Sequence, residues 1–511
     1  MTRRRAEPRC LAFAFAAWAA LAQAQQTAPP GGLTVQTRVS LMQSWTDNLR
    51  LVDQNKDAAL ITTVSPGISI AGSSGVWRGS LDYSLNGIAY VKSDEASRVQ
   101  NVLSANAQAE LISRTLFVDV RANIGQQSAS AFGLQSSPTS GTQGSVSSLA
   151  NPNQHETSTL VVSPSLRGRL GGVATYDLRG DFTRTDVRGS SLGDSHGTGG
   201  SLRINQANAG LLGWWLAATT QQVKSVSAPA NRNSSLTAGL TYRPDLEWSF
   251  TANVGQERNN YLGSNTRSGV TSGATAEWVP TPRTRIGADF QRHEYGNSHA
   301  LNFEHRMARS VWRYSDTQST MVGNTGASGG VRTVYDQFFL LFTSLEPDPV
   351  KRDVYVRNYL QSQGLSPDAV VAGGFLSTGP SRLRNQQLSV TLQGPRSSLS
   401  AQFSRSVTSR LGDNLNPGSD LANTSHIEQR SFSLSASHQL TPTSGISLIG
   451  SRQETAGDAS SQSTQLTSLF ANWNARFGMR LSGQLGARHS RFEGFTSYTE
   501  NAVYASLTQQ F

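Results

Sequence analysis

The sequence predicts an all-β fold, a transmembrane up-and-down antiparallel β-barrel of about 22 strands (range roughly 18–22), on three observations. The chain ends in an alternating segment, Asn501-Ala-Val-Tyr-Ala-Ser-Leu-Thr-Gln-Gln-Phe511, whose last residue is aromatic. Segments of roughly 10 to 14 residues that alternate apolar and polar side chains recur along the chain, about the length of a tilted membrane strand. Tight and long connections alternate between these segments, as periplasmic turns and external loops do.

The final segment has the character of a closing barrel strand. Strand side chains alternate with period 2, so Val503, Ala505, Leu507 and Phe511 share one face. Bacterial outer-membrane barrels commonly end this way, and we expect the barrel-assembly machinery to read Phe511. Gln509 departs from the aromatic or apolar residue often found two positions before the end.

The amino-terminal residues predict export. Arg3, Arg4, Arg5 and Arg9 precede an apolar run, and Ala22-Gln23-Ala24 supplies a cleavage pattern, so residues 1–24 are a predicted signal peptide and 25–511 the mature barrel. Cys10 is the single cysteine of the chain and lies in this leader. The mature chain is therefore expected to contain no disulfide scaffold, thiolate metal site or cysteine nucleophile.

Composition favours a barrel over other membrane and soluble classes. Only 37% of residues are apolar and 15% charged, whereas a barrel needs apolar side chains on one face alone. No segment approaches 18 apolar residues, which excludes helical spans and leaves the closed barrel as the structure that satisfies every backbone group in lipid. We therefore predict localisation in the outer membrane of a Gram-negative bacterium.

The charge balance is basic. The net charge is +10, and the leader contributes four Arg against Glu7, or +3, which leaves +7 for residues 25–511. Such charge indicates either contact with anionic solutes and acidic polysaccharide or an outer surface that meets lipopolysaccharide phosphates. The sequence contains no recognisable nucleic-acid module, and we expect no nucleic-acid partner.

Individual segments show the two faces of the predicted strands. The apolar set Trp77-Gly79-Leu81-Tyr83-Leu85 alternates with Arg78-Ser80-Asp82-Ser84-Asn86, and 246–254, 431–437 and 468–488 behave similarly. The polar sets are rich in Ser, Asn, Gln and Arg, as a wet lumen requires. Five tryptophans lie toward segment ends, where aromatic girdles form, namely Trp77, Trp248, Trp278, Trp312 and Trp473.

One region departs from strand alternation. Thr333-Val-Tyr-Asp336 is a capping-box pattern that opens an apolar stretch from Tyr335 to Leu345, and Asp348-Pro349 offers a second helix start. We predict a two-helix insertion at 333–376 on the external side. The pattern leaves two alternatives open: the insertion plugs the lumen, or it rests on the rim.

This insertion carries a family resemblance. Ser344-Leu-Glu-Pro-Asp-Pro-Val-Lys-Arg352, with Val356, Tyr359-Leu360 and Gly364-Leu365 after it, resembles the proline-bracketed insertion of the PEP-CTERM/exosortase-associated outer-membrane β-barrel proteins. Trp45-Thr-Asp-Asn-Leu49, followed by Thr63-Val-Ser-Pro-Gly-Ile68, resembles the opening hairpin of these proteins. His305-Arg-Met-Ala-Arg-Ser-Val-Trp312 resembles their hairpin before the insertion. The resemblance implies a porin-like protein associated with exopolysaccharide production and exosortase sorting, and it supplies no catalytic residues.

The chain offers no convincing catalytic, cofactor or metal site. His293, His299 and His305 are close in sequence but lack HExxH spacing, and Gly296-Asn297 is predicted to turn the chain between them. No GxSxG pattern is present. We predict a protein that is not an enzyme, with no cofactor, no metal and no catalytic residues.

One cluster of arginines is a candidate binding site. Arg476, Arg480, Arg488 and Arg491 lie on or near the polar faces of the last hairpin. If luminal, they could form a cationic strip for uronate or phosphate groups of an anionic exopolysaccharide. The alternative is ordinary ion pairing with luminal Asp and Glu, which we favour by about two to one.

Three functions follow in order of preference. The first is transport, the export or secretion of exopolysaccharide through the barrel. The second is a structural or adhesive scaffold whose lumen is plugged and whose loops bind matrix polymer. The third is an outer-membrane hydrolase of lipid or polysaccharide.

Overall fold

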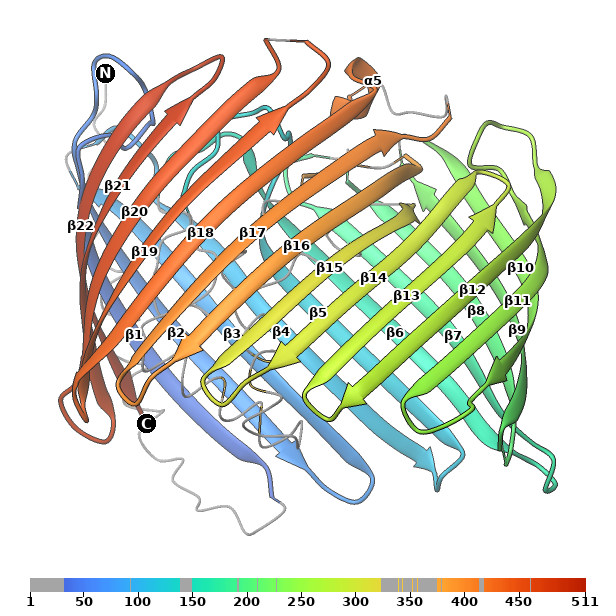
Figure 1. The fold of residues 1–511 in the computed structure, drawn as a ribbon. Helices are drawn as coiled ribbons and strands as arrows, with labels where there is room; N and C mark the ends of the chain where they lie inside the picture. The colour runs from blue at the N-terminus through green and yellow to red at the C-terminus, as the bar shows by residue number, and fades with distance from the viewer. Residues whose placement is uncertain are drawn as a thin grey trace.

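The structure, a computed structural model, describes residues 32–511 except 92, 138–148, 191–192, 209, 227, 378, 413–417 and 460, and except 323–374, of which only Phe339, Phe342, Arg352 and Val356 are described. The predicted signal peptide at 1–24 lies outside the described residues. The chain forms one antiparallel sheet of 22 strands, drawn in Figure 1. The strands are β1 (Thr34–Thr46), β2 (Ala59–Ser73), β3 (Trp77–Val91), β4 (Arg98–Ile112), β5 (Leu116–Ser128), β6 (Gln154–Leu170), β7 (Ala174–Val187), β8 (Ser195–Gln206), β9 (Leu212–Ser225), β10 (Ala228–Tyr242), β11 (Trp248–Asn259), β12 (Arg267–Thr281), β13 (Thr284–His293), β14 (Gly296–Arg306), β15 (Ser310–Met321), β16 (Ser381–Gln393), β17 (Ser397–Arg410), β18 (His426–Thr441), β19 (Ser444–Ala456), β20 (Ser463–Arg476), β21 (Leu481–Glu493) and β22 (Tyr498–Gln510).

The sheet closes on itself through its first and last strands. β1 pairs with β22 antiparallel from Arg38 opposite Gln510 to Thr46 opposite Ala502. The amide of Phe511 donates to the carbonyl of Thr37 at 2.9 Å, just beyond that ladder. Closure leaves no open sheet edge, which is the condition for strands in lipid. The predicted barrel is confirmed, with a strand count at the top of the expected range.

Connection lengths define the two ends of the barrel. Between β2 and β3, and at every second connection after it, two to five residues join the strands. Most connections at the opposite end are longer, including 47–58, 129–153 and 411–425. Short turns face the periplasm and long loops face outward, so Phe511 lies at the periplasmic end. Figure 1 shows the long loops at the top.

The predicted alternation of connections has three exceptions. β9 ends at Ser225 and β10 begins at Ala228, and β13 ends at His293 and β14 begins at Gly296, so these two external connections have two residues each. The β21–β22 connection, 494–497, has four residues and is also as short as periplasmic turns. The turn predicted at Gly296-Asn297 is wrong in position, because Glu294 and Tyr295 form it. Gly296 has φ +128, a conformation that a side chain would strain.

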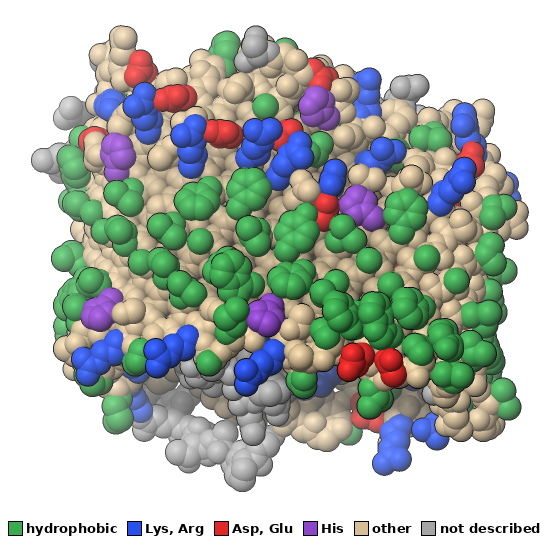
Figure 2. All heavy atoms as spheres, in the orientation of Figure 1, with side chains coloured by type: hydrophobic (Ala, Val, Ile, Leu, Met, Phe, Trp, Pro, Cys, Tyr) green, Lys and Arg blue, Asp and Glu red, His purple; other side chains and the backbone are tan. Residues whose placement is uncertain are grey.

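The two faces of the sheet separate apolar from polar side chains as predicted. Leu85, Phe250, Phe432, Leu469 and Leu507 are all exposed on the outer face. Figure 2 shows the resulting band of hydrophobic side chains around the wall. An apolar outer band on a closed barrel is the arrangement that lipid requires. The protein is an outer-membrane β-barrel.

The five tryptophans noted above gather at one end of the barrel. Trp77 and Trp248 are the first residues of β3 and β11, and Trp278 stacks on Trp248 with ring centroids 5.2 Å apart. Trp312 and Trp473 lie near the periplasmic ends of β15 and β20. These rings form a girdle at the periplasmic interface, where amphipathic aromatic side chains are most stable.

Helical structure is a small part of the described chain. α5 (Asp420–Asn423) is a single turn in the β17–β18 loop. Within the described residues no helix is long and apolar enough to cross a bilayer. The predicted insertion at 333–376 falls mostly outside the described residues and stays a prediction. Of its described residues, Phe339, Arg352 and Val356 are helical, and the Arg352 guanidinium lies 4.3 Å from the Phe339 ring centroid.

The direction in which each side chain points predicts unequal losses of stability for neighbouring substitutions in β18. Leu434 points to lipid, and Ser435 points into the lumen. Leu434→Arg should cost about 2–4 kcal/mol because the charge would lie in hydrocarbon, whereas Ser435→Arg should cost under about 1 kcal/mol. Urea titration of the refolded barrel in lipid vesicles measures both. Equal costs would contradict the assigned register.

Candidate functional site: the lumen and its external mouth

The β5–β6 loop folds into the barrel. Its described parts are 129–137 and 149–153, and both contact luminal side chains from distant strands. Ser137 forms hydrogen bonds with the hydroxyls of Ser468 and Ser490, the latter at 3.1 Å. The Tyr498 hydroxyl donates to the carbonyl of Gln135 at 2.8 Å. Because those partners lie on β20, β21 and β22, the loop reaches from β5 past the first four strands to the closing strands.

An apolar cluster holds one edge of this loop. Leu149 packs with buried side chains of the first loop and of the luminal wall, which are Leu49, Leu51, Ala59, Ile61, Ile88, Val102, Phe492 and Tyr498. These side chains face inward at the external ends of β2, β3, β4, β21 and β22. The expectation of a polar lumen is therefore wrong at this level, where burying apolar surface under the loop stabilises its inward position.

A second anchor lies on α5. The Asp420 carboxylate accepts hydrogen bonds from the amide of Ala131 at 2.6 Å and from the Ser130 hydroxyl at 2.8 Å. Ala131 also packs with buried Phe375, Leu421 and Ile427. The amide of Leu376 donates to the carbonyl of Ser128 at 3.1 Å. The β5–β6 loop is thus anchored at two sides of the barrel mouth, and its residues between the two anchors cross the lumen.

The luminal wall from β1 to β15 carries charges, many of them in close pairs. Arg38 donates to Asp82 at 2.6 Å, and Arg179 bridges Asp119 and Asp181 at 3.2 and 3.0 Å. Further luminal pairs join Glu304 to Arg306 and Arg313, and Arg285 to Glu277. Opposite charges at these distances largely cancel each other's field. This part of the lumen therefore presents many hydrogen-bonding groups and little net charge.

The luminal face of the next four strands, β16 to β19, is almost uncharged. Luminal positions of β16, β17, β18 and β19, which are described in full, carry Ser, Thr, Asn and Gln with a few apolar residues, and Arg410 at the external end of β17 is their one charged residue. Hydroxyls pair across strands here, with Ser404 and Ser431 at 2.6 Å and Ser398 and Ser437 at 2.6 Å. We call this surface the hydroxyl wall.

The four arginines of the predicted cationic strip do not form one surface. Arg488 is luminal, but it is buried and donates to Glu500 at 2.7 Å. Arg491 follows three residues later and so lies on the outer face, where it pairs with Glu493 at 2.7 Å. Arg476 and Arg480 lie at the periplasmic end of the same hairpin. Ion pairing, the alternative that the sequence favoured, is what Arg488 shows.

The three histidines of one sequence cluster also separate. His293 is luminal and contacts Glu257 at 3.0 Å, whereas His299 faces outward and contacts Asp316 at 3.2 Å. His305 contacts the Thr284 hydroxyl at 2.9 Å. Among the described residues, no three His, Cys, Asp or Glu side chains come together as metal ligands would.

Sequence reasoning missed the residues that fix the loop. Gln135 and Ser137 lie in the segment 127–155, whose many Ser, Gly and Gln residues predict a mobile loop, and Asp420 lies in the segment 411–424, which the sequence predicts only as a long connection. The signal that could have found them is the presence of Phe132, Leu134 and Leu149 within that polar stretch, because apolar side chains in an external loop need a surface to cover them.

Removing Arg488 should destabilise the barrel far more than removing Arg491. Arg488→Ala leaves the Glu500 carboxylate buried with Thr46 as its remaining hydrogen-bond donor at 2.8 Å, at a cost of about 3–5 kcal/mol. The exposed Arg491–Glu493 pair should contribute about 0–1 kcal/mol. Urea unfolding in micelles, followed by the gel mobility of unheated protein, measures both, and comparable losses would contradict this account.

Loop anchoring should strengthen as pH falls. Burial raises the pKa of the Asp420 carboxyl, and the hydrogen bonds from Ala131 and Ser130 oppose that rise. Detachment of the loop would return Asp420 to an ordinary value of about 3.9, so the anchored state binds the proton more tightly and gains stability as pH falls through the raised value. In planar bilayer recordings, lowering the pH from 7 to about 4 should lengthen the intervals during which the anchored loop keeps the barrel closed to ions. Asp420→Asn should abolish this dependence.

Comparisons with known proteins add the following. No protein-family model matches the chain, and no curated protein matches it. Similar solved structures include the siderophore receptor PirA from Pseudomonas aeruginosa (10% identity, 95% of this chain, 81% of that chain, TM-score 0.45). Another is the FrpB iron transporter from Neisseria meningitidis, with 11% identity, 93% of this chain and 81% of that chain covered, and a TM-score of 0.47. A third is the ferric-catecholate import receptor Fiu from E. coli K12, with 8% identity, 95% of this chain and 82% of that chain covered, and a TM-score of 0.48. At this identity the likeness concerns the fold alone, and the barrel rests on the strand pairing described above.

Proposed function

We propose that this outer-membrane barrel is a transport protein that passes a hydrated, hydroxyl-rich polymer, an exopolysaccharide linked to the PEP-CTERM/exosortase system. The hydroxyl wall is the observation that carries the proposal. Hydroxyl and amide groups exchange hydrogen bonds with sugar hydroxyls at little net cost, because each replaces a similar bond to water. A wall whose one charge is Arg410 at its external end also offers no tight site along its length at which a neutral polymer would stall.

The width of the barrel supports passage of a large solute. Twenty-two strands spaced about 4.8 Å apart and tilted by about 40° give a mean backbone diameter of about 45 Å. Side chains from two facing sheets meet when the backbones are about 10 Å apart. Wall side chains therefore leave the centre open, and the chain segments that fold inward set the size of any pore.

The apolar cluster at the mouth favours the scaffold as a second candidate. A lumen closed there would leave the external loops as the binding surface for matrix polymer. The hydrolase alternative has the weakest support. Its one observation is a hydrogen-bonded series from the Glu257 carboxylate to His293 at 3.0 Å and from His293 to the Ser298 hydroxyl at 3.1 Å, the order of groups that a Ser–His–acid triad would need. The resemblance in the insertion supports the link to exopolysaccharide. The predicted cationic strip does not support it, because its four arginines do not form one surface.

The remaining partners are proposed on the same basis. The outer band is expected to contact lipid, with lipopolysaccharide at its external edge. Phe511 ends the closing strand at the periplasmic side, where the barrel-assembly machinery would meet it.

Shortening the inward loop separates transport from scaffold. Replacing 131–151 with a short Gly-Ser linker removes the hydrogen bonds to β20–β22 and the Leu149 contact. For a transporter we expect conductance in planar bilayers to rise several-fold, since ion flow follows the open cross-section. The matched control shortens the external loop at 188–194, which should leave conductance unchanged.

Secretion by living cells provides the second readout. Cells that lack the chain should secrete less exopolysaccharide, and the full-length chain should restore it. Absence of pores from both the shortened and the intact protein, with normal secretion in the deletion strain, would refute transport and favour the scaffold.

A further inference from the structure

The outer face of the barrel carries a basic surface at its external end. On β10 to β20, whose residues are all described, outward positions hold eight arginines and three carboxylates, namely Arg232, Arg258, Arg292, Arg382, Arg384, Arg405, Arg430 and Arg452 against Asp316, Glu428 and Glu454. Figure 2 shows part of this row just above the hydrophobic band. Charges here face the lipid headgroups and not the lumen.

Hydrogen bonds hold several of these guanidinium groups in place. Asp316 accepts from Arg384 at 2.7 Å, from Gln386 at 3.0 Å and from His299 at 3.2 Å. Glu428 accepts from Arg405 at 2.8 Å and from Arg430 at 2.6 Å. Arg405 uses all three of its guanidinium nitrogens on Glu428 and Gln386. Arg384 uses Nε and Nη2 on Asp316, and Arg430 uses Nε on Glu428, so Nη nitrogens of these two arginines are left for an external acceptor.

Two further arginines flank this network without a carboxylate. Arg292 lies on the outer face of β13, two residues beyond Phe290, and no ion pair joins it to a described residue. Arg382 donates to the carbonyl of Tyr295 at 3.3 Å. Both are on the external side of the apolar band, so the outer face of β13 to β16 carries three arginines against one carboxylate.

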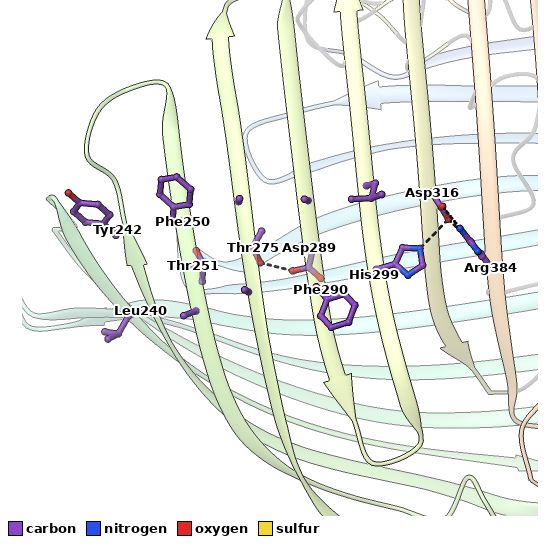
Figure 3. Close-up of a pocket in the computed structure, with 15 residues that line it drawn as sticks. Leu240, Tyr242, Phe250, Thr251, Thr275, Asp289, Phe290, His299, Asp316 and Arg384 are labelled. Atoms are coloured by element: carbon purple, nitrogen blue, oxygen red, sulfur yellow. Dashed lines mark hydrogen bonds and ion pairs between the residues drawn. The ribbon is translucent and has the colours of Figure 1, made fainter.

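An apolar groove begins directly below this point. It has a volume of about 740 Å³, and its outward floor consists of the small side chains Ala252, Ala274, Ala276 and Ala288. Leu240, Phe250, Phe290 and Leu301 form its sides. Figure 3 shows His299, Asp316 and Arg384 together at one end of the groove, with Phe250 and Phe290 along it. A hollow in a lipid-facing wall is filled by whatever hydrocarbon fits it.

We propose that this surface is a binding site for one lipid A unit of outer-leaflet lipopolysaccharide, with acyl chains in the groove and phosphate at the arginines of β13–β17. Charge complementarity selects the occupant. Guanidinium groups bind phosphate bidentately, and several at one site favour a ligand with more than one phosphate. The external position places the site in the leaflet that contains lipopolysaccharide, and buried acyl methylenes add to the affinity.

The test uses the full-length barrel in detergent and measures binding of bis-phosphorylated lipid A and of phosphatidylglycerol by native mass spectrometry. Arg292→Gln with Arg382→Gln removes phosphate donors without leaving a carboxylate unpaired. Ala276→Leu with Ala288→Leu, a facing pair on β12 and β13, fills the groove and keeps every charge. We expect each double variant to lose at least about tenfold in lipid A affinity.

Matched controls lie elsewhere on the same barrel. Arg121→Gln with Arg203→Gln removes two luminal arginines, and Ala105→Leu with Ala122→Leu enlarges another facing outward pair. Both controls should bind lipid A as the unchanged protein does. Retention of full affinity by both test variants, equal losses in the controls, or phosphatidylglycerol binding as tight as lipid A binding would overturn the proposal. Conductance is measured in parallel and is expected to stay unchanged.

Discussion

The pairing of β1 with β22 is the constraint on which the rest of the structure depends. Nine residue pairs join strands that are separated by almost the whole chain. Without this ladder each strand would expose a row of backbone donors and acceptors to hydrocarbon, at several kcal/mol per unsatisfied group. Closure removes both edges together. It also fixes which residues face lipid, because strand pairing around the ring allows no independent slip in register.

The fold was largely predictable from the sequence because lipid imposes a simple rule on every strand. Leu434 and Ser435 show it: one neighbour faces hydrocarbon and the next faces water, and that contrast repeats with period 2. Turn positions were less predictable. Glu294 and Tyr295 form a tight connection at the external end, where loop length follows function and not the demands of lipid.

The candidate site was much less predictable, since luminal contacts join residues far apart in sequence. The four arginines of the last hairpin show why. Arg488 and Arg491 differ by three positions and therefore lie on opposite faces of one strand, and the partner of Arg488 belongs to the following strand. Likewise, Asp420 meets Ala131 across the mouth, and no local pattern relates a loop residue to an amide nearly three hundred positions away.

The two-residue external connections after β9 and after β13 have a geometric consequence. The rim is low along that side and higher at the β17–β18 loop, so the opening slopes. Under the proposed transport, polymer leaving such a mouth would be guided sideways, towards the neighbouring lipid headgroups, and would spread along the cell surface before it projects from it.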